Sequence, residues 1–167
     1  NESTANVTSL GGCYFGEQTT IINQSSEATT YTLGSTLADT FSTTVSIQNK
    51  RGSLSINNAI FNDSTTFINF DTSATSNTFV LGNTGVTRFY GALLLDNSTS
   101  GMKFGDIGVA YLEETGTIST ITDPTGNIVI KHFVQLGSTP QSFYLPLSNS
   151  KLILLGNNIF NGNFTFT

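Results

Sequence analysis

Charged side chains are scarce in this sequence of 167 residues: they make up 10% of the chain, against roughly 25% in an average soluble protein. The six Lys and Arg residues are scattered and the formal net charge is −5. Nucleic-acid binding requires a basic stripe that neutralises phosphates, so we expect no nucleic-acid partner. No apolar run approaches the roughly 20 residues of a membrane-spanning helix, so we expect no membrane insertion.

Cysteine and histidine occur once each, and tryptophan is absent. Cys13 cannot form an internal disulfide, so it is expected to be either a buried free thiol or half of an intermolecular disulfide. Strand alternation places His132 on one face with three apolar residues, Ile128, Ile130 and Val134. A catalytic triad needs a nucleophile, a base and an orienting group, and zinc needs several His or Cys ligands. We therefore expect no enzymatic activity, no metal and no cofactor.

The acidic residues give no convergent site either. Glu113 and Glu114 form the one adjacent carboxylate pair, and neighbours on a strand point to opposite faces. Residues 96–101 resemble the front of a calcium loop, but Ile107 stands where the bidentate Glu is expected. A polar turn is the better interpretation of that segment.

Aromatic and small polar residues are abundant. The chain has 13 Phe and five Tyr, enough to close a core and to argue against disorder. Ser, Thr and Asn together supply 63 residues. Apolar residues alternate with polar ones along residues 41–47, 107–111, 143–147 and 160–166, which is the period of a β-strand.

Turn signals recur about every ten residues, at positions 50–52, 62–64, 82–85, 96–98, 123–126 and 155–157. Short strands at this spacing predict an all-β fold of eleven to fourteen strands, with at most one short helix around residues 35–39. Segments 65–85 and 87–105 have similar lengths, yet their residues do not superimpose, so no clean repeat is apparent. An antiparallel sandwich or jelly roll is therefore preferred, and a β-helical fibre shaft is the alternative.

The chain is expected to divide into an N-terminal tail, residues 1–10, and a single β domain, residues 11–167. The tail is too polar to supply a core, so we expect it to pair as a strand with another subunit, or else to form an edge strand of its own sheet. The terminal strand offers a second pairing edge. The candidate assembly contacts are Val7, Leu10, Phe160, Phe164 and Phe166.

Six Asn residues begin an Asn-x-Ser/Thr sequence, the acceptor pattern for N-linked glycans. Two of them, Asn62 and Asn97, fall in predicted turns and are the preferred acceptors. The full set of candidate glycosylation sites is Asn1, Asn6, Asn23, Asn62, Asn97 and Asn163.

Short Thr-, Asn- and Gly-rich strands, such as residues 78–86 and 116–122, resemble the shafts of viral and phage tail fibres. The low charge, the polar tail and the alternating last strand also resemble secreted pilins that donate a terminal strand. This resemblance implies a non-catalytic structural subunit of an extracellular or virion filament, on a cell or virion surface, with copies of itself as partners. The alternative is a receptor- or carbohydrate-binding adhesin module whose partners are host-cell or surface glycans.

Overall fold

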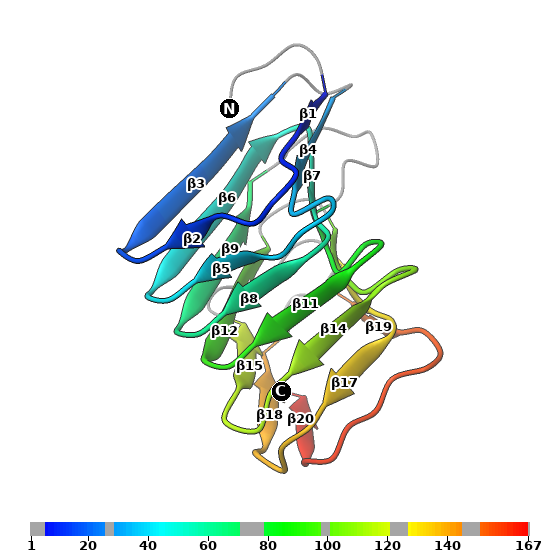
Figure 1. Cartoon of the computed structure of the whole chain (residues 1–167). Helices are drawn as coiled ribbons and strands as arrows, with labels where there is room; N and C mark the ends of the chain where they lie inside the picture. The colour runs from blue at the N-terminus through cyan, green and yellow to red at the C-terminus, as the bar shows by residue number, and fades with distance from the viewer. Residues whose placement is uncertain are drawn as a thin grey trace.

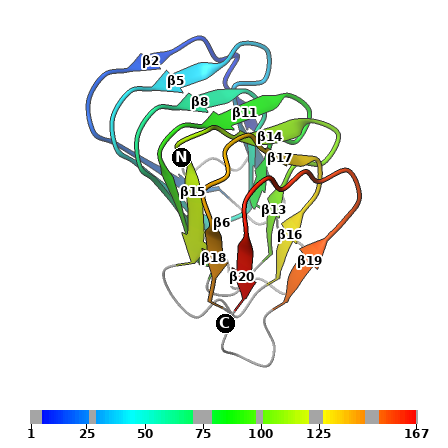
Figure 2. The same cartoon turned by 90° about the horizontal axis from the view of Figure 1, so that it is seen from below.

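The chain winds into a parallel β-helix, as the computed structural model shows for residues 6–25, 29–70, 79–97, 101–120, 127–144 and 151–166. Those residues hold twenty strands and no helix. One circuit of the chain, here called a rung, adds one strand to each of three sheets, and successive rungs stack from the β1 end to the β20 end (Figure 1). The end-on view shows the sheets arranged around a common interior (Figure 2).

Sheet A has one strand from each of seven rungs, all parallel to their neighbours. Positions in register lie 23 to 26 residues apart, as with Phe79 and Met102, then Met102 and Ile128. The strands are β1 (Val7–Thr8), β4 (Thr30–Leu33), β7 (Ser53–Ile56), β10 (Phe79–Leu81), β13 (Met102–Phe104), β16 (Ile128–Ile130) and β19 (Leu152–Leu154).

Sheet B has six short strands, and a single bridge between Val134 and Ile159 extends it into the seventh rung. Its strands are β2 (Tyr14–Phe15), β5 (Asp39–Phe41), β8 (Ala59–Phe61), β11 (Val86–Phe89), β14 (Val109–Leu112) and β17 (Phe133–Gln135). These strands cross the front of the molecule in Figure 1.

Sheet C completes each rung. Its strands are β3 (Thr19–Gln24), β6 (Val45–Arg51), β9 (Thr65–Asn69), β12 (Ala92–Asn97), β15 (Thr117–Thr120), β18 (Gln141–Phe143) and β20 (Phe164–Phe166). The corner between sheets B and C is short: three residues, Asn62, Asp63 and Ser64, join β8 to β9.

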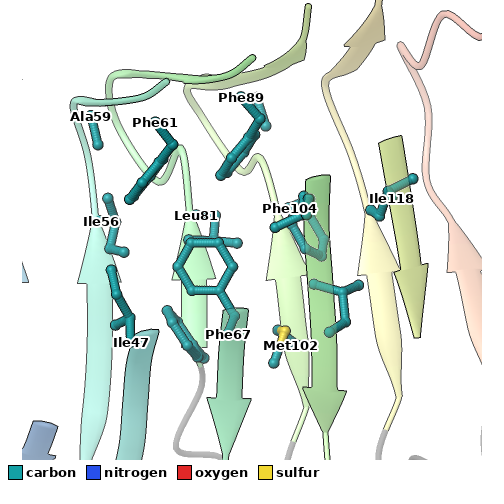
Figure 3. Packing of buried hydrophobic residues seen from close by; sticks show 14 of the residues in the cluster. Ile47, Ile56, Ala59, Phe61, Phe67, Leu81, Phe89, Met102, Phe104 and Ile118 are labelled. Atoms are coloured by element: carbon teal, nitrogen blue, oxygen red, sulfur yellow. The ribbon is translucent and has the colours of Figure 1, made fainter. Parts of the chain in front are cut away.

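Inward-facing side chains form continuous columns along the solenoid axis. Because the strands are parallel and in register, apolar residues of one rung stack on apolar residues of the next and pack the interior. The rings of Phe15, Phe41, Phe61 and Phe89 stack in sequence, with centroids 4.6, 4.9 and 5.1 Å apart and near-parallel planes. Figure 3 shows Phe61 and Phe89 in this column, above Leu81 and Phe67.

A second column consists of asparagines at the carboxyl ends of the sheet C strands. Asn23, Asn49 and Asn69 are in register and fully buried. The Nδ2 of Asn23 donates to Oδ1 of Asn49 over 2.8 Å, and the Nδ2 of Asn49 donates to Oδ1 of Asn69 over 3.1 Å. Each amide thus acts as donor and acceptor, which satisfies polar groups that would otherwise be buried without partners.

The structure corrects the preferred prediction of an antiparallel sandwich or jelly roll. The all-β class is confirmed, and the alternative of a β-helix is correct. The predicted turns at residues 62–64 and 82–85 exist, but they are corners that lead the chain into the next sheet and not hairpins that fold it back on itself. A strand therefore pairs with the strand one full rung later. The helix expected around residues 35–39 is absent, since Asp39 begins β5 and the residues before it form a bend.

Candidate functional site

The outer faces of the solenoid differ in chemistry. On sheet C the central outward row carries a hydroxyl in six of seven rungs, at Thr20, Ser46, Thr66, Ser119, Ser142 and Thr165, with Leu94 between Thr66 and Ser119. On sheet B the corresponding row is mostly aromatic or aliphatic: Tyr14, Thr40, Ile60, Arg88, Tyr111, Val134 and Ile159. Of these two central rows, the row on sheet B is therefore the less polar.

Several exposed large side chains lie on or beside sheet B. Tyr14 is 71% exposed, Tyr90 40% and Leu136 43%. Tyr90 directly follows β11, and Leu136 directly follows β17. Apolar side chains that gather on one face mark interaction surfaces more often than apolar side chains scattered singly.

Arg88 lies at the centre of a four-residue cluster on this face, called here the Arg88 cluster: Arg88, Tyr90, Tyr111 and Glu113. The Nη1 of Arg88 donates to Oε1 of Glu113 over 2.5 Å. The Arg88 guanidinium carbon lies 4.6 Å from the centre of the Tyr111 ring, within the range of a cation–π contact. Glu113 is 8% exposed, so its carboxylate is held in a largely desolvated position against Arg88.

The register explains how the cluster forms. Arg88 on β11 and Tyr111 on β14 are partners in adjacent rungs, and the pairing of Phe89 with Leu112 places Tyr90 beside Glu113 in the next row. The hydrogen bond to Glu113 is the largest cause that raises the pKa of Arg88, and the Glu113 charge and the nearby phenols of Tyr90 and Tyr111 act in the same direction. The guanidinium remains charged and fixed in place.

A second ionic group lies on the A–B corner of rungs five and six. The carboxylate of Asp106 accepts from Nζ of Lys103 over 2.8 Å and from Nζ of Lys131 over 3.1 Å. Both hydrogen bonds lower the pKa of Asp106 below its usual value. Since all three side chains are between a quarter and a third exposed, the group is a solvated surface network.

The candidate assembly residues lie at the two ends of the solenoid. Val7 is in β1 and pairs with Tyr31 of the same chain, and the Leu10 carbonyl accepts from the backbone N–H groups of Thr36 and Leu37. In the described residues, then, the N-terminal segment forms an edge strand of its own sheet, which was the alternative to a donated strand. Contact of this edge with another subunit stays a prediction, as does the division at residue 10.

At the opposite end, Phe160 and Phe164 pack against the core, with ring centroids 4.4 Å apart. Phe166 is 53% exposed, although its partner Phe143 in the preceding rung is fully buried. These three phenylalanines belong to the last rung described.

The candidate glycosylation sites differ in accessibility. Asn6, Asn62 and Asn163 are exposed. Asn23 is fully buried in the asparagine column, so the folded chain cannot carry a glycan on its Nδ2. Asn1 and the side chain of Asn97 lie outside the described residues.

Two single-residue predictions need correction. Cys13 is exposed, so the expectation of a buried thiol is wrong; its backbone N–H donates to Oδ1 of Asp39 over 3.0 Å. His132 is not on the core face with Ile128 and Ile130, because it lies in the turn before β17 with a φ of 51°. That left-handed residue breaks the alternation from which its position was predicted.

Glu113 is buried and Glu114 exposed, but both follow the end of β14, so the expected placement on opposite faces of a strand does not apply to them. The segment that resembles a calcium loop lies mostly outside the described residues. In the described ranges there is no group of three or more His, Cys, Asp or Glu side chains that could hold a metal, and no pocket is present. The same ranges contain no helix long and apolar enough to span a membrane.

Comparisons of the chain with protein-family models, with curated proteins and with solved structures found no match. The function has to be inferred from the side chains that the solenoid displays. The sequence patterns used above do not single out Arg88, Tyr90 or Tyr111 as functional residues. The signal that could have joined them is the 23-residue offset between Gly82-Asn-Thr-Gly-Val86 and Gly105-Asp-Ile-Gly-Val109, which aligns Arg88 with Tyr111.

Proposed function

We propose that this chain is a non-catalytic binding module of the adhesin type, which acts outside the cell and holds a surface ligand along the outer face of sheet B. The observation that carries the proposal is the difference between the faces: sheet B presents tyrosine, aliphatic and paired ionic side chains, while the central row of sheet C presents hydroxyls. A ligand that lies across successive rungs meets one side chain of the outer row of sheet B at each rung spacing of about 4.8 Å.

The solenoid suits such a role because its backbone is rigid and its outer side chains are free to vary. Inward positions are fixed by the stacked core, whereas outward positions such as Ile60 and Val134 need only β-compatible side chains. A binding surface of this kind is extended and shallow, in keeping with the absence of a pocket in the described residues. The low charge and the single Cys are compatible with life outside the cytoplasm.

The test compares single lysine substitutions on the two faces. Ile60→Lys and Val134→Lys put a charge on the outer row of sheet B, and Thr66→Lys and Ser119→Lys are the matched controls on sheet C. Each protein is assayed for retention on insoluble polysaccharides, on a glycan array and on immobilised extracellular-matrix proteins. We expect the unmodified chain to be retained by at least one of these ligands and the sheet B variants alone to lose retention. No retention of the unmodified chain, or equal loss from both faces, would contradict the proposal.

End-on self-association is a second candidate, and it retains the filament hypothesis. Leu154 is 49% exposed, although its register partner Ile130 is fully buried. Phe166 shows the same contrast with Phe143. A second copy whose β1, β2 and β3 edge paired with β19 and β20 would cover both side chains and keep all strands parallel.

Sedimentation at increasing protein concentration tests this second candidate. Self-association predicts a rise in mass that Leu154→Asp abolishes and that the outward-face variant Ser142→Asp leaves intact. A chain that stays monomeric at every concentration would remove the filament hypothesis, and electron microscopy would show whether any assembly is a regular fibre.

A further inference from the structure

We propose that the Arg88 cluster is a subsite for one unit of a neutral saccharide. This inference rests on the proposed binding function and names the ligand class for one part of sheet B. It is drawn from the chemistry and spacing of Arg88, Tyr90, Tyr111 and Glu113.

The four side chains leave the sheet from a small rectangle. Arg88 and Tyr111 are one rung apart, about 4.8 Å, and Tyr90 and Glu113 lie two residues further along the chain, each directly after the end of its strand, about 6.6 Å away. A rectangle of this size is comparable with one pyranose ring. All four side chains can therefore contact the same sugar unit, and the next unit would lie over a neighbouring rung.

The donor and acceptor pattern fits vicinal hydroxyl groups. Arg88 carries five N–H donors in a planar fork, and its bond to Glu113 uses one of them. The Glu113 carboxylate has acceptor capacity beyond the single bond from Arg88. A sugar diol, whose hydroxyls each donate and accept, can bridge the guanidinium and the carboxylate.

The tyrosines supply the apolar part of the site. Sugar rings present a face of C–H groups that packs on aromatic rings. Tyr90 is 40% exposed and offers its ring to the solvent, while the cation–π contact with Arg88 holds the Tyr111 ring in place. A fixed ring loses little conformational entropy when a ligand binds, which favours a shallow site of this kind.

Charge favours a neutral ligand over an acidic one. Glu113 neutralises Arg88 at 2.5 Å, so the cluster has no net charge to attract a carboxylate or sulfate. Lys103 and Lys131, on the A–B corner of rungs five and six, are bound to Asp106. The whole chain is acidic, with a formal charge of −5, and this also disfavours an anionic polysaccharide.

The experiment compares neutral hexose oligosaccharides with uronic-acid oligosaccharides of the same length, by titration calorimetry on the intact chain. Arg88→Lys keeps the positive charge but loses the planar fork, and Tyr90→Ala removes the exposed ring. Tyr144→Ala is the matched control, since Tyr144 is 51% exposed but directly follows β18 of sheet C, away from the proposed binding face. A circular-dichroism melt of each variant verifies the fold.

We expect binding of a neutral oligosaccharide, a roughly tenfold or greater increase in Kd for Tyr90→Ala and Arg88→Lys, and an unchanged Kd for Tyr144→Ala. Tighter binding of the uronic-acid series, or equal effects of Tyr90→Ala and Tyr144→Ala, would overturn the saccharide subsite and leave the proposed function standing. If no saccharide binds but the sheet B lysine variants still abolish retention on a protein ligand, the subsite is likewise overturned. Failure of the proposed function itself is distinct, because the unmodified chain would then be retained by no ligand of either kind.

Discussion

Asn23 donates a hydrogen bond from its Nδ2 to the Oδ1 of Asn49 over 2.8 Å, across two adjacent rungs. Asn49 in turn donates to Asn69 and to the carbonyl of Gly52, and it is fully buried. This amide therefore holds together three rungs and the corner between sheets C and A.

Asn49→Ala is expected to lower the free energy of unfolding by about 3 kcal/mol, because it leaves buried donors and acceptors on its neighbours without partners. Urea denaturation measures the loss as a lower midpoint with an unchanged slope. Asn62→Ala, at an exposed corner, is the control and should have little effect. Equal stability of the two variants would mean that the asparagine column contributes nothing.

Phe61→Ala is expected to destabilise the chain by roughly 3 to 5 kcal/mol. The ring stacks on Phe41 and Phe89 and contacts the edge of Phe67, so its removal opens a cavity in the middle of the column. Phe166→Ala is the comparison, since that ring is 53% exposed and should cost clearly less. Thermal unfolding followed by circular dichroism measures both, and a similar loss for the two would contradict the role of the stack.

The all-β class followed from the sequence because inward and outward residues alternate in every solenoid strand, as they do in a sandwich. The alternation at residues 41–47 illustrates the limit of that signal. Phe41, Val45 and Ile47 are indeed buried, yet they belong to two strands, β5 and β6, in different sheets. Some corners preserve the alternation of inward and outward residues from one strand to the next. Periodicity alone cannot distinguish such a corner from a continuous strand.

The parallel topology could not be derived from the turns. Short polar corners and hairpin loops use the same residues, and what separates them is pairing at long range. The repeat that would have revealed the pairing is masked by variable rung lengths, such as 23 residues from Phe79 to Met102 and 26 from Met102 to Ile128. The Arg88 cluster was missed for the same reason, because its members become neighbours through that register.

Gly105→Ala is expected to destabilise the chain on the order of 3 kcal/mol. Gly105 has a φ of +67°, which is costly for any residue with a Cβ, and an added Cβ would lie 1.8 Å from the carbonyl oxygen of Lys131. Gly156→Ala is the matched control, since an added Cβ there meets nothing within 4 Å. The difference between the two melting temperatures is the measurement, and its absence would show that the corner can rearrange.

If the chain is produced in a glycosylating host, glycans are expected on Asn62 and not on Asn23. Asn62 is exposed in the corner between β8 and β9, whereas the Nδ2 of Asn23 is buried and hydrogen-bonded to Asn49. Mass spectrometry of the peptides gives the occupancy of each site. A substantial glycan occupancy at Asn23 would mean that modification precedes folding and that the first rung differs in the modified protein.

The Asp106 network predicts a small, pH-dependent contribution to stability. Hydrogen bonds from Lys103 and Lys131 lower the pKa of Asp106 below its usual value, so the folded state favours the ionised carboxylate more than the unfolded state does. The contribution is therefore fully present above the unfolded pKa and is lost as the pH falls through the lower folded pKa.

Because the Asp106 side chain is 31% exposed, this contribution to the free energy of unfolding should amount to no more than about 1 kcal/mol. Asp106→Asn should melt slightly lower than the unmodified chain at pH 7, and the two melting temperatures should converge as the pH falls through the lowered pKa of the folded Asp106. Glu114→Gln, which removes an exposed negative charge in the turn after β14, controls for the change in net charge. A difference between Asp106→Asn and the unmodified chain that stays constant from pH 7 to pH 2 would show that the ionised carboxylate does not stabilise this corner.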